Sequence, residues 1–247
     1  MHPHLGPRMA KLFSLAMFFL CLAPALGFAA NFGVSPVRVE LSPTQRTAAL
    51  TLRNAGDEAV VVQLQLVAWS QEGGQDIYIP TTDLIATPPI FTIKAGGAQV
   101  VRVGLRRAPD PLRELSYRIY LQEVPGPPKL SGPGLQMALR IGLPVFVAPE
   151  VPRQRDVQWR GEQTAQGGLK IRALNNGNAH VQIIDFKLTE PGKELVAAAS
   201  QGAGYLLPGQ AKEWLLKLDA PLTTDRLRLK AITVGGEINA ELPIAKP

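Results

Sequence analysis

Cysteine is almost absent from this sequence. The 247 residues include a single one, Cys21, and it lies in an N-terminal segment that we expect to be removed. The mature chain would then carry no cysteine, which excludes disulfide bonds and cysteine nucleophiles. Its stability must come from the burial of apolar side chains, and hydrophobic residues make up 46% of the chain.

Histidine is also scarce. The chain has three histidines, and only His180 lies beyond the N-terminal segment, so a histidine-based triad or a multi-histidine metal site lacks its residues. The acidic residues are dispersed through expected turns, and Gly202-Ala-Gly204 lacks the spacing of a phosphate-binding loop. The sequence therefore predicts no catalytic residues, no metal and no cofactor, and we expect the protein not to be an enzyme.

Aromatic residues make up only 6% of the chain. A carbohydrate-binding β-sandwich presents exposed aromatic side chains to its sugar, and this sequence has few to offer. Trp69 and Trp159 are most easily interpreted as core residues of two sandwiches.

The charge of the chain is modest. Of its 26 basic residues, Arg8 and Lys11 lie in the segment expected to be removed, which leaves 24 against 20 acidic residues. The remaining basic residues are scattered without a Lys/Arg block, so the sequence does not favour nucleic-acid binding.

Residues 1–29 have the three parts of a secretory signal peptide. Arg8 and Lys11 give the positive start, Leu12 to Leu22 form an uncharged apolar run, and Gly27-Phe28-Ala29 offers small residues for cleavage near Ala29. A retained membrane anchor is the alternative, but the run is shorter than the 18 or so residues that a spanning helix needs. We expect an exported mature chain without stable membrane insertion.

Cys21 also raises the alternative of a lipoprotein. Leu20 before it is larger than the small residue expected at a lipidation site, so a soluble mature protein is favoured.

Beyond the signal segment, short alternating runs separated by turn residues predict an all-β protein. About seven strands precede residue 148, which is the size and rhythm of an immunoglobulin-like sandwich. These strands are expected at Val34–Leu41, Thr47–Arg53, Val60–Ser70, Ile90–Ile93, Ala98–Leu105, Ser116–Val124 and Leu135–Val147.

Ala148 to Pro152 interrupts the pattern, because Pro149 and Pro152 cannot donate to a strand ladder. We place the domain boundary there, with one domain over residues 30–149 and a second, smaller β-sandwich over residues 153–247. Strands of the second are expected at Gly168–Asn175, Ala179–Thr189, Glu213–Leu218 and Leu227–Thr233.

A row of large apolar side chains follows the Pro/Gly-rich segment at residues 125–134, which we expect to be a long hairpin loop. Leu135, Met137, Leu139 and Ile141 share one face by the two-residue period of a strand. This run is either an ordinary core strand or an edge strand that offers its apolar row to another protein.

Several motifs together resemble those of the PapD-like periplasmic pilus chaperones. The first runs from Asp83-Leu-Ile-Ala-Thr-Pro-Pro-Ile90 to Gln99-Val-Val-Arg-Val103, the second is Tyr117-Arg-Ile-Tyr-Leu-Gln-Glu-Val-Pro125, and the third is Leu135 to Pro149. The resemblance covers residues 32–150 and is weak beyond residue 154. It implies two immunoglobulin-like sandwiches in a boomerang arrangement.

The resemblance also implies a basic anchor for the C-terminal carboxylate of a pilus subunit. Arg38 occupies the place of one family cation. The second family cation is a lysine on the seventh strand, and Pro144 stands in its place here. Arg118 is the most suitable substitute and Arg140 a weaker one. The Leu143-Pro-Val-Phe146 ending is similar to a divergent branch of the family.

On this resemblance, Leu135, Met137, Leu139 and Ile141 are the donor side chains that fill the groove of an incomplete pilus subunit. The implied function is a periplasmic chaperone that binds subunits and delivers them to an outer-membrane usher. The main alternative is a secreted structural or adhesive subunit of a surface fibre. Such a subunit would carry a donor extension at its start, whereas residues 31–36 lead directly into the first expected strand.

Overall fold

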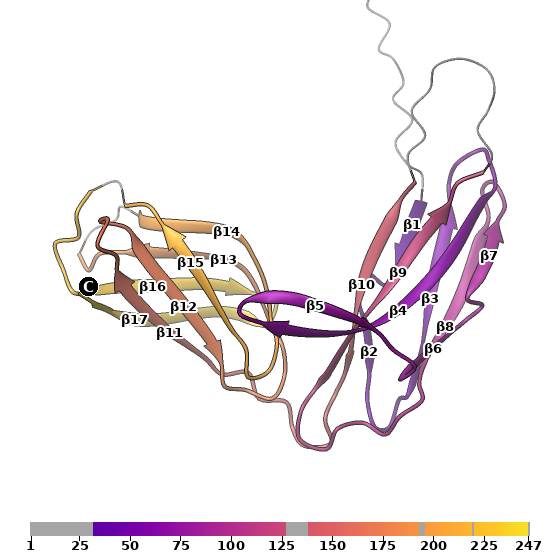
Figure 1. Cartoon of the computed structure of the whole chain (residues 1–247), viewed down its shortest axis with the longest axis horizontal. Coiled ribbons are helices and arrows are strands. Elements are labelled where there is room, and N and C mark those ends of the chain that lie inside the picture. Colours follow the sequence, from indigo (N-terminus) through magenta and orange to yellow (C-terminus); the bar gives the residue numbers. More distant parts are fainter. Residues whose placement is uncertain (1–31, 127–137, 193–195, 219, 247) are drawn as a thin grey trace, which may run out of the picture. The chain divides into compact units, whose positions relative to one another are not determined.

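A computed structural model of the chain describes residues 32–126, 138–192, 196–218 and 220–246. Every regular element in these ranges is a β-strand, which confirms the all-β prediction. The strands form two sandwiches, one before and one after residue 148 (Figure 1).

The first sandwich consists of two facing sheets. Their inner side chains form one core, to which β3, β8, β9 and β10 contribute Leu50, Val101, Ile119 and Val145. One sheet has the order β1 (Phe32–Ser35), β3 (Thr47–Asn54), β8 (Ala98–Leu105) and β6 (Leu84–Thr87). The other has the order β2 (Val39–Leu41), β10 (Arg140–Val147), β9 (Leu115–Val124), β4 (Val60–Glu72) and β5 (Gln75–Pro80), with β7 (Ile90–Ile93) also paired to β4.

The prediction of one continuous strand at Val34–Leu41 is wrong. The structure divides it into β1, which pairs with β3, and β2, which pairs with β10 in the other sheet. Pro36 lies at the break, where its missing N–H would interrupt a ladder. The expected strand at Leu135–Val147 begins at Arg140 in the structure, and residues 135–137 lie outside the described ranges.

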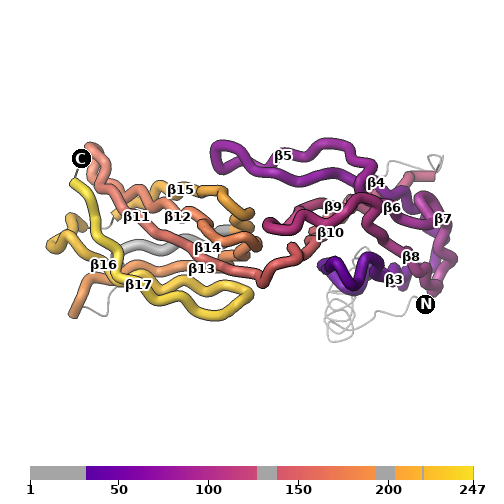
Figure 2. The backbone as a smooth tube through the Cα atoms, turned by 90° about the horizontal axis from the view of Figure 1, so that it is seen from below, coloured from indigo at the N-terminus to yellow at the C-terminus, as the bar shows by residue number. Residues whose placement is uncertain are grey.

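The second sandwich is one continuous sheet that folds over its own core. Leu169 and Ile171 of β12 pack with Phe186 of β13 and Leu229 of β16, and Figure 2 shows these strands from below. The order of the strands is β14 (Val196–Leu206), β13 (Val181–Thr189), β16 (Arg226–Thr233), β17 (Gly236–Ala245), β11 (Val157–Gln163), β12 (Leu169–Asn175) and β15 (Ala211–Leu216).

The two tryptophans lie in different surroundings. Trp159 packs against the core of the second sandwich, as predicted. The prediction that Trp69 is a core residue of the first sandwich is wrong, because it packs with Phe146 and Leu207 where the two sandwiches meet. Its position in β4 puts it on the outer face of the sheet, opposite the core.

Candidate functional site

Arg38 and Glu40 lie on the outer face of the sheet formed by β2, β10, β9, β4 and β5. Val39 and Leu41 alternate with them and are buried in the core of the first sandwich. Since successive side chains of a strand point to opposite faces, Arg38 and Glu40 face away from this core. The alternation of the sequence therefore sets the direction of both charged side chains.

Arg118 reaches the same face from β9, and Pro144 of β10 lies between the two arginines. Pro144 pairs with Arg118 in the antiparallel register, and the parallel pair Val145–Val39 puts Arg38 beside Pro144 on the other side. Because neighbouring strands are about 4.8 Å apart, the Cα atoms of the arginines are roughly 10 Å apart. The structure thus brings Arg38 and Arg118 to one face of the sheet, on either side of Pro144.

Arg118 rests on aromatic rings. Its guanidinium carbon lies 4.5 Å from the ring centroid of Trp69 and 5.2 Å from that of Tyr78. Its buried Nε has no hydrogen-bond partner among the described residues. A cation on an aromatic surface gains attraction without losing its charge, so Arg118 retains the capacity to bind an anion.

Asp76 holds these rings in place. Its carboxylate accepts hydrogen bonds from Trp69 Nε1 at 3.0 Å, from Gln71 Nε2 at 2.9 Å and from the Tyr78 hydroxyl at 3.0 Å. Burial raises the pKa of Asp76, but these hydrogen bonds and the nearby charge of Arg118 lower it below its ordinary value. Asp76 is therefore a charged acceptor beneath the aromatic surface.

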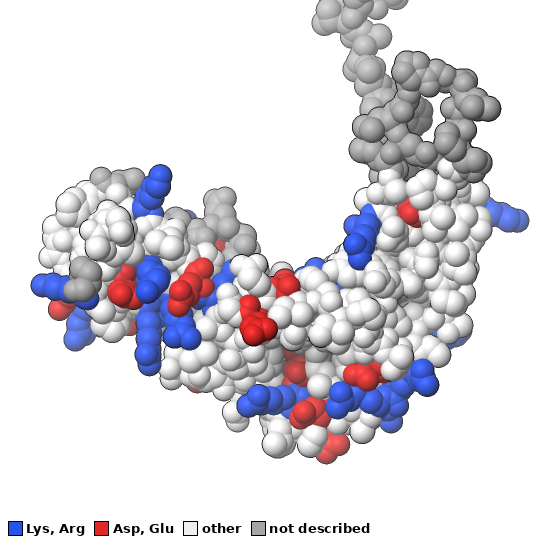
Figure 3. Space-filling view, in the orientation of Figure 1, with Lys and Arg blue, Asp and Glu red and all other residues white. Residues whose placement is uncertain are grey.

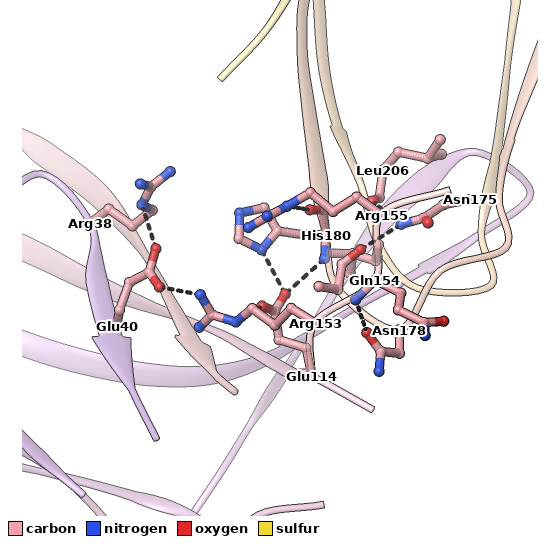
Figure 4. A network of polar contacts seen from close by, with 12 residues as sticks. Arg38, Glu40, Glu114, Arg153, Gln154, Arg155, Asn175, Asn178, His180 and Leu206 are labelled. Carbon is pink, nitrogen blue, oxygen red and sulfur yellow. Dashed lines mark hydrogen bonds and ion pairs between the residues drawn. The ribbon is translucent and has the colours of Figure 1, made fainter. Parts of the chain in front are cut away.

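Arg38 is paired with an acidic residue. Its Nε lies 3.2 Å from Glu40 Oε1, and the other carboxylate oxygen of Glu40 accepts a hydrogen bond of 2.8 Å from Arg153 Nη1 (Figure 4). Burial alone would raise the pKa of Glu40, but the hydrogen bond from Arg153 and the charges of Arg153 and Arg38 lower it below its ordinary value. Arg38 and Arg118 thus share a face but have different surroundings.

Tyr205 of β14 faces this site from the second sandwich. Its ring is 5.2 Å from Trp69 in an edge-on contact and 5.6 Å from Phe146. Burial raises the pKa of the Tyr205 hydroxyl, while the charges of Arg38 and Arg118 act in the opposite direction. Both cations therefore lie within electrostatic reach of one phenol group.

A buried polar junction lies beside the site. His180 Nδ1 is 2.6 Å from Glu114 Oε1, which also accepts a hydrogen bond of 2.9 Å from the backbone N–H of His180 (Figure 4). Arg153 Nε is 3.5 Å from the other Glu114 oxygen but makes no hydrogen bond with it. Sequence reasoning missed this junction, because Glu114 and His180 lie 66 residues apart and no local pattern connects them.

Gln71 forms a second polar link between the sandwiches. Its side-chain amide donates to the Tyr205 carbonyl at 3.0 Å and accepts from the Leu207 N–H at 2.9 Å. The amide thus binds the backbone at the end of β14 and just beyond it as a neighbouring strand would, and it fixes Tyr205 near the arginines.

Arg140 is not brought to the other two arginines. It pairs with Gln122, four residues along β10 from Pro144, which is about 13 Å at the rise of a strand. Its guanidinium lies 4.0 Å above the Tyr120 ring and donates to Gln65 Oε1 at 3.0 Å. Its surroundings differ from those of Arg38 and Arg118.

The described part of the apolar row lies at a sheet edge. β10 pairs with β9 along its whole length, but with β2 only from Val145 to Val147. Among the described residues, one edge of β10 is therefore unpaired from Arg140 to Pro144. Leu139 and Ile141 are half-buried there: Ile141 packs against the core, and Leu139 lines a small pocket with Phe32 and Leu121. Leu135 and Met137 lie outside the described ranges.

The described ranges contain no group of three or more His, Cys, Asp or Glu residues that could hold a metal ion. They also contain no helix that is long and apolar enough to cross a membrane. On the face drawn in Figure 3, basic side chains are interspersed with acidic ones.

Residues 31–152 match the family of pili and flagellar-assembly chaperones, in its PapD N-terminal domain. This chain is a PapD-like chaperone. The matched residues include the first sandwich with Arg38, Arg118 and β10. A comparison with curated protein sequences found no significant match.

Solved structures similar to this PapD-like chaperone share its fold. One is the CsuC-CsuE chaperone-tip adhesion subunit pre-assembly complex of Acinetobacter baumannii, with 21% identity, a TM-score of 0.62, and coverage of 88% of this chain and 100% of the other. The E. coli chaperone DraB has 21% identity, a TM-score of 0.59 and coverage of 85% and 96%. The Pseudomonas aeruginosa chaperone CupB2 has 18% identity, a TM-score of 0.56 and coverage of 86% and 100%. The prediction of two immunoglobulin-like sandwiches is confirmed.

Proposed function

We propose that this PapD-like chaperone captures pilus subunits by two contacts that lie on the same sheet. Arg118 and Arg38 bind the C-terminal carboxylate of the subunit, and the strand that ends in β10 fills the subunit's groove. The observation that carries the proposal is the unpaired edge of β10, with Arg118 beside Pro144 and no ion pair for Arg118 among the described residues. A carboxylate would supply the negative charge that Arg118 lacks.

Arg118 takes the larger part in this proposal. Its guanidinium lies on the rings of Trp69 and Tyr78, which hold it in place. A carboxylate that binds the guanidinium would form charge-assisted hydrogen bonds, which are stronger than those between neutral groups. Arg38 adds a second cation, and Arg140 stays with Tyr120 and Gln65.

The donated strand would extend the sheet beyond the chaperone itself. Backbone groups at the free edge of β10 would pair with a subunit strand and fix its register. Leu139 and Ile141, with Leu135 and Met137 before them, would bury their side chains in the subunit groove. Each large apolar side chain that leaves water contributes roughly 1.5–3 kcal/mol before the cost of association.

The place of action is the periplasm. Residues 1–29 would act as a signal peptide that is cleaved near Ala29, and the mature chain would hand its subunits to an outer-membrane usher. We further propose that residues 30–149 and 153–247 are separate domains. The two cores support this division, because each sandwich buries its own set of side chains.

The proposal is tested by exporting the full chain together with a pilus subunit from the same organism. A tagged chain should recover the subunit from the periplasm in a soluble complex of one copy of each. The same subunit extended by a short glycine tail, which moves its carboxylate, should be recovered much less. Equal recovery of the two forms would contradict the carboxylate anchor, and recovery of neither would contradict the proposed function.

A further inference from the structure

The charges of Arg38 and Arg118 are balanced differently. Arg118 makes no ion pair among the described residues, and it lies on Trp69 and Tyr78. Arg38 already holds a carboxylate, because its Nε lies 3.2 Å from Glu40 Oε1. A carboxylate that arrives at Arg38 therefore meets a resident one.

The contact with Glu40 occupies one side of Arg38. It uses Nε, and Figure 4 shows the two terminal nitrogens directed away from Glu40. The Tyr205 hydroxyl is the other polar neighbour of this guanidinium, because a hydrogen bond with Arg38 acts to lower the pKa of that hydroxyl. These terminal nitrogens carry N–H groups that can hold a carboxylate from a second side. A subunit carboxylate can thus bind Arg38 while Glu40 stays in place, and the two carboxylates then share one guanidinium.

Glu40 is held where it is and stays charged. Arg153 Nη1 donates to its second oxygen at 2.8 Å, so Glu40 links the guanidinium groups of Arg38 and Arg153. The Glu40 side chain is 38% exposed, so solvent screens its charge without removing its effect over a few ångströms. The resident carboxylate therefore repels an incoming one to a moderate degree.

We propose that Glu40 limits how strongly the site holds the terminal carboxylate of a subunit, and that it keeps capture reversible. This inference rests on the function proposed above. Through its bond to Nε, Glu40 also aims the terminal nitrogens of Arg38 at the subunit. A chaperone that hands its subunit on requires an anchor that selects a carboxylate and then releases it, and Glu40 supplies the second property.

The deciding variant is Glu40→Gln. The glutamine carbonyl can still accept from Arg38 Nε, whereas its NH2 group cannot accept from Arg153 Nη1. The variant thus keeps the contact that directs Arg38, and removes the negative charge together with the hydrogen bond from Arg153. The full chain is exported with a labelled pilus subunit, the complex is purified, and release of the label is followed after excess unlabelled wild-type chain is added. We expect release from Glu40→Gln to be about 3- to 10-fold slower than from the wild type.

A matched control is Glu162→Gln. Glu162 belongs to β11 of the second sandwich and pairs with Lys170 at 2.6 Å, so this variant makes the same change of net charge away from the site. Its release rate should equal that of the wild type. In the double variant Glu40→Gln with Arg38→Ala, release should match that of Arg38→Ala alone, because Glu40 acts through Arg38.

Release from Glu40→Gln at the wild-type rate or faster would overturn this inference, provided that its thermal melt is unchanged. A slower release that persists without Arg38 would also overturn it, because the effect would then not pass through this arginine. If the wild-type chain captured no subunit, the proposed function would fail and this inference with it. If the wild-type chain captured the subunit and Glu40→Gln released it at the wild-type rate, the role of Glu40 would be rejected while the proposed function would stand.

Discussion

The imidazole of His180 lies face to face with the ring of Phe146, with centroids 3.6 Å apart and planes 11° from parallel. The same imidazole contacts Glu114 through Nδ1 at 2.6 Å. One residue of the second sandwich thus packs on β10, the strand with the free edge, and contacts a carboxylate that is buried in the first.

His180→Phe separates these two contacts. Phenylalanine keeps a flat ring on Phe146 but leaves the buried Glu114 without its contact to Nδ1, although the backbone N–H of residue 180 and Arg153 remain. We expect a loss of about 1–3 kcal/mol in the free energy of unfolding, measured by urea denaturation at neutral pH. A stability equal to that of the wild type would mean that the stacked ring alone holds the junction.

Acid should weaken the aromatic surface beneath Arg118, because the pKa of Asp76 is lower in the folded chain than in the unfolded chain. A lowered folded-state pKa contributes stability that is complete above the unfolded value of about 4 and is lost as pH falls toward the folded value. Asp76→Asn should therefore be less stable at neutral pH, by about 1 kcal/mol because the site is partly exposed. The difference should shrink below pH of about 4.

Thermal melts of both proteins from pH 7 to pH 2 check this expectation. Asp110 serves as a control, since its pKa is also lowered, first by hydrogen bonds from the backbone N–H groups of Arg113 and Leu112 and then by the charges of Arg107 and Arg113. None of these residues belongs to the proposed anchor. Asp110→Asn should show the same trend in stability without altering subunit capture. A constant difference between Asp76→Asn and the wild type across this range would contradict the role of the carboxylate charge.

Regular alternation made several strands predictable. The expected Ala98–Leu105 is β8 as observed, and Thr47–Arg53 is β3 without its last residue. Buried positions alternate with more exposed ones along the whole of β3, and in β8 up to Val103, which is a local signal. The break between β1 and β2 was not predicted, because the choice of sheet depends on pairing with β3 and β10, far along the chain.

The site was predictable only in part. Arg38 and Arg118 were named through the resemblance to a family, and the structure brings them to one face. Their surroundings were not foreseen, since Trp69, Asp76 and Tyr205 approach from β4, β5 and β14. Contacts between residues so distant in sequence leave no periodic trace, and the polar groups that fix them look like ordinary surface residues until the strands are paired.

Arg118 and Arg140 should respond differently to substitution. Arg118→Ala removes a cation that has no ion pair among the described residues, and the loss of its charge-assisted hydrogen bonds should weaken subunit binding about 10- to 100-fold. Arg118→Lys should recover only part, because a lysine offers a point charge instead of a planar fork. Arg140→Ala should weaken binding far less, since that side chain interacts with Tyr120 and Gln65.

Binding of a purified subunit to the folded variants measures these differences, with Arg160→Ala as the control. Arg160 is an exposed residue of β11 in the second sandwich, so its loss matches the change in charge. Stronger weakening by Arg140→Ala than by Arg118→Ala would reverse the assignment of the anchor.

The last prediction concerns the parity of the strand that leads into β10. Leu139 is half-buried and lines a pocket with Phe32, Val60, Val62 and Leu121, whereas its neighbour Ala138 is exposed. In the complex, Leu139→Asp would put an unpaired carboxylate into the apolar groove of the subunit, which costs several kcal/mol. Ala138→Asp would leave its carboxylate in water. We therefore expect Leu139→Asp to lose the subunit and Ala138→Asp to keep it.

Thermal melts of the isolated variants, compared with subunit recovery, distinguish strand donation from an internal core role. If Leu139 contacts the subunit, Leu139→Asp should keep the melting temperature of the wild type. The small pocket lies beside the unpaired edge of β10, so a charged side chain there can turn toward water. If Leu139 serves only the chaperone's own core, the same variant should lose its fold together with its subunit. A Leu139→Asp protein that kept both its thermal stability and its subunit would show that this strand is not the binding surface. A charge at residue 139 would then be buried neither in the subunit groove nor in the chaperone's own core.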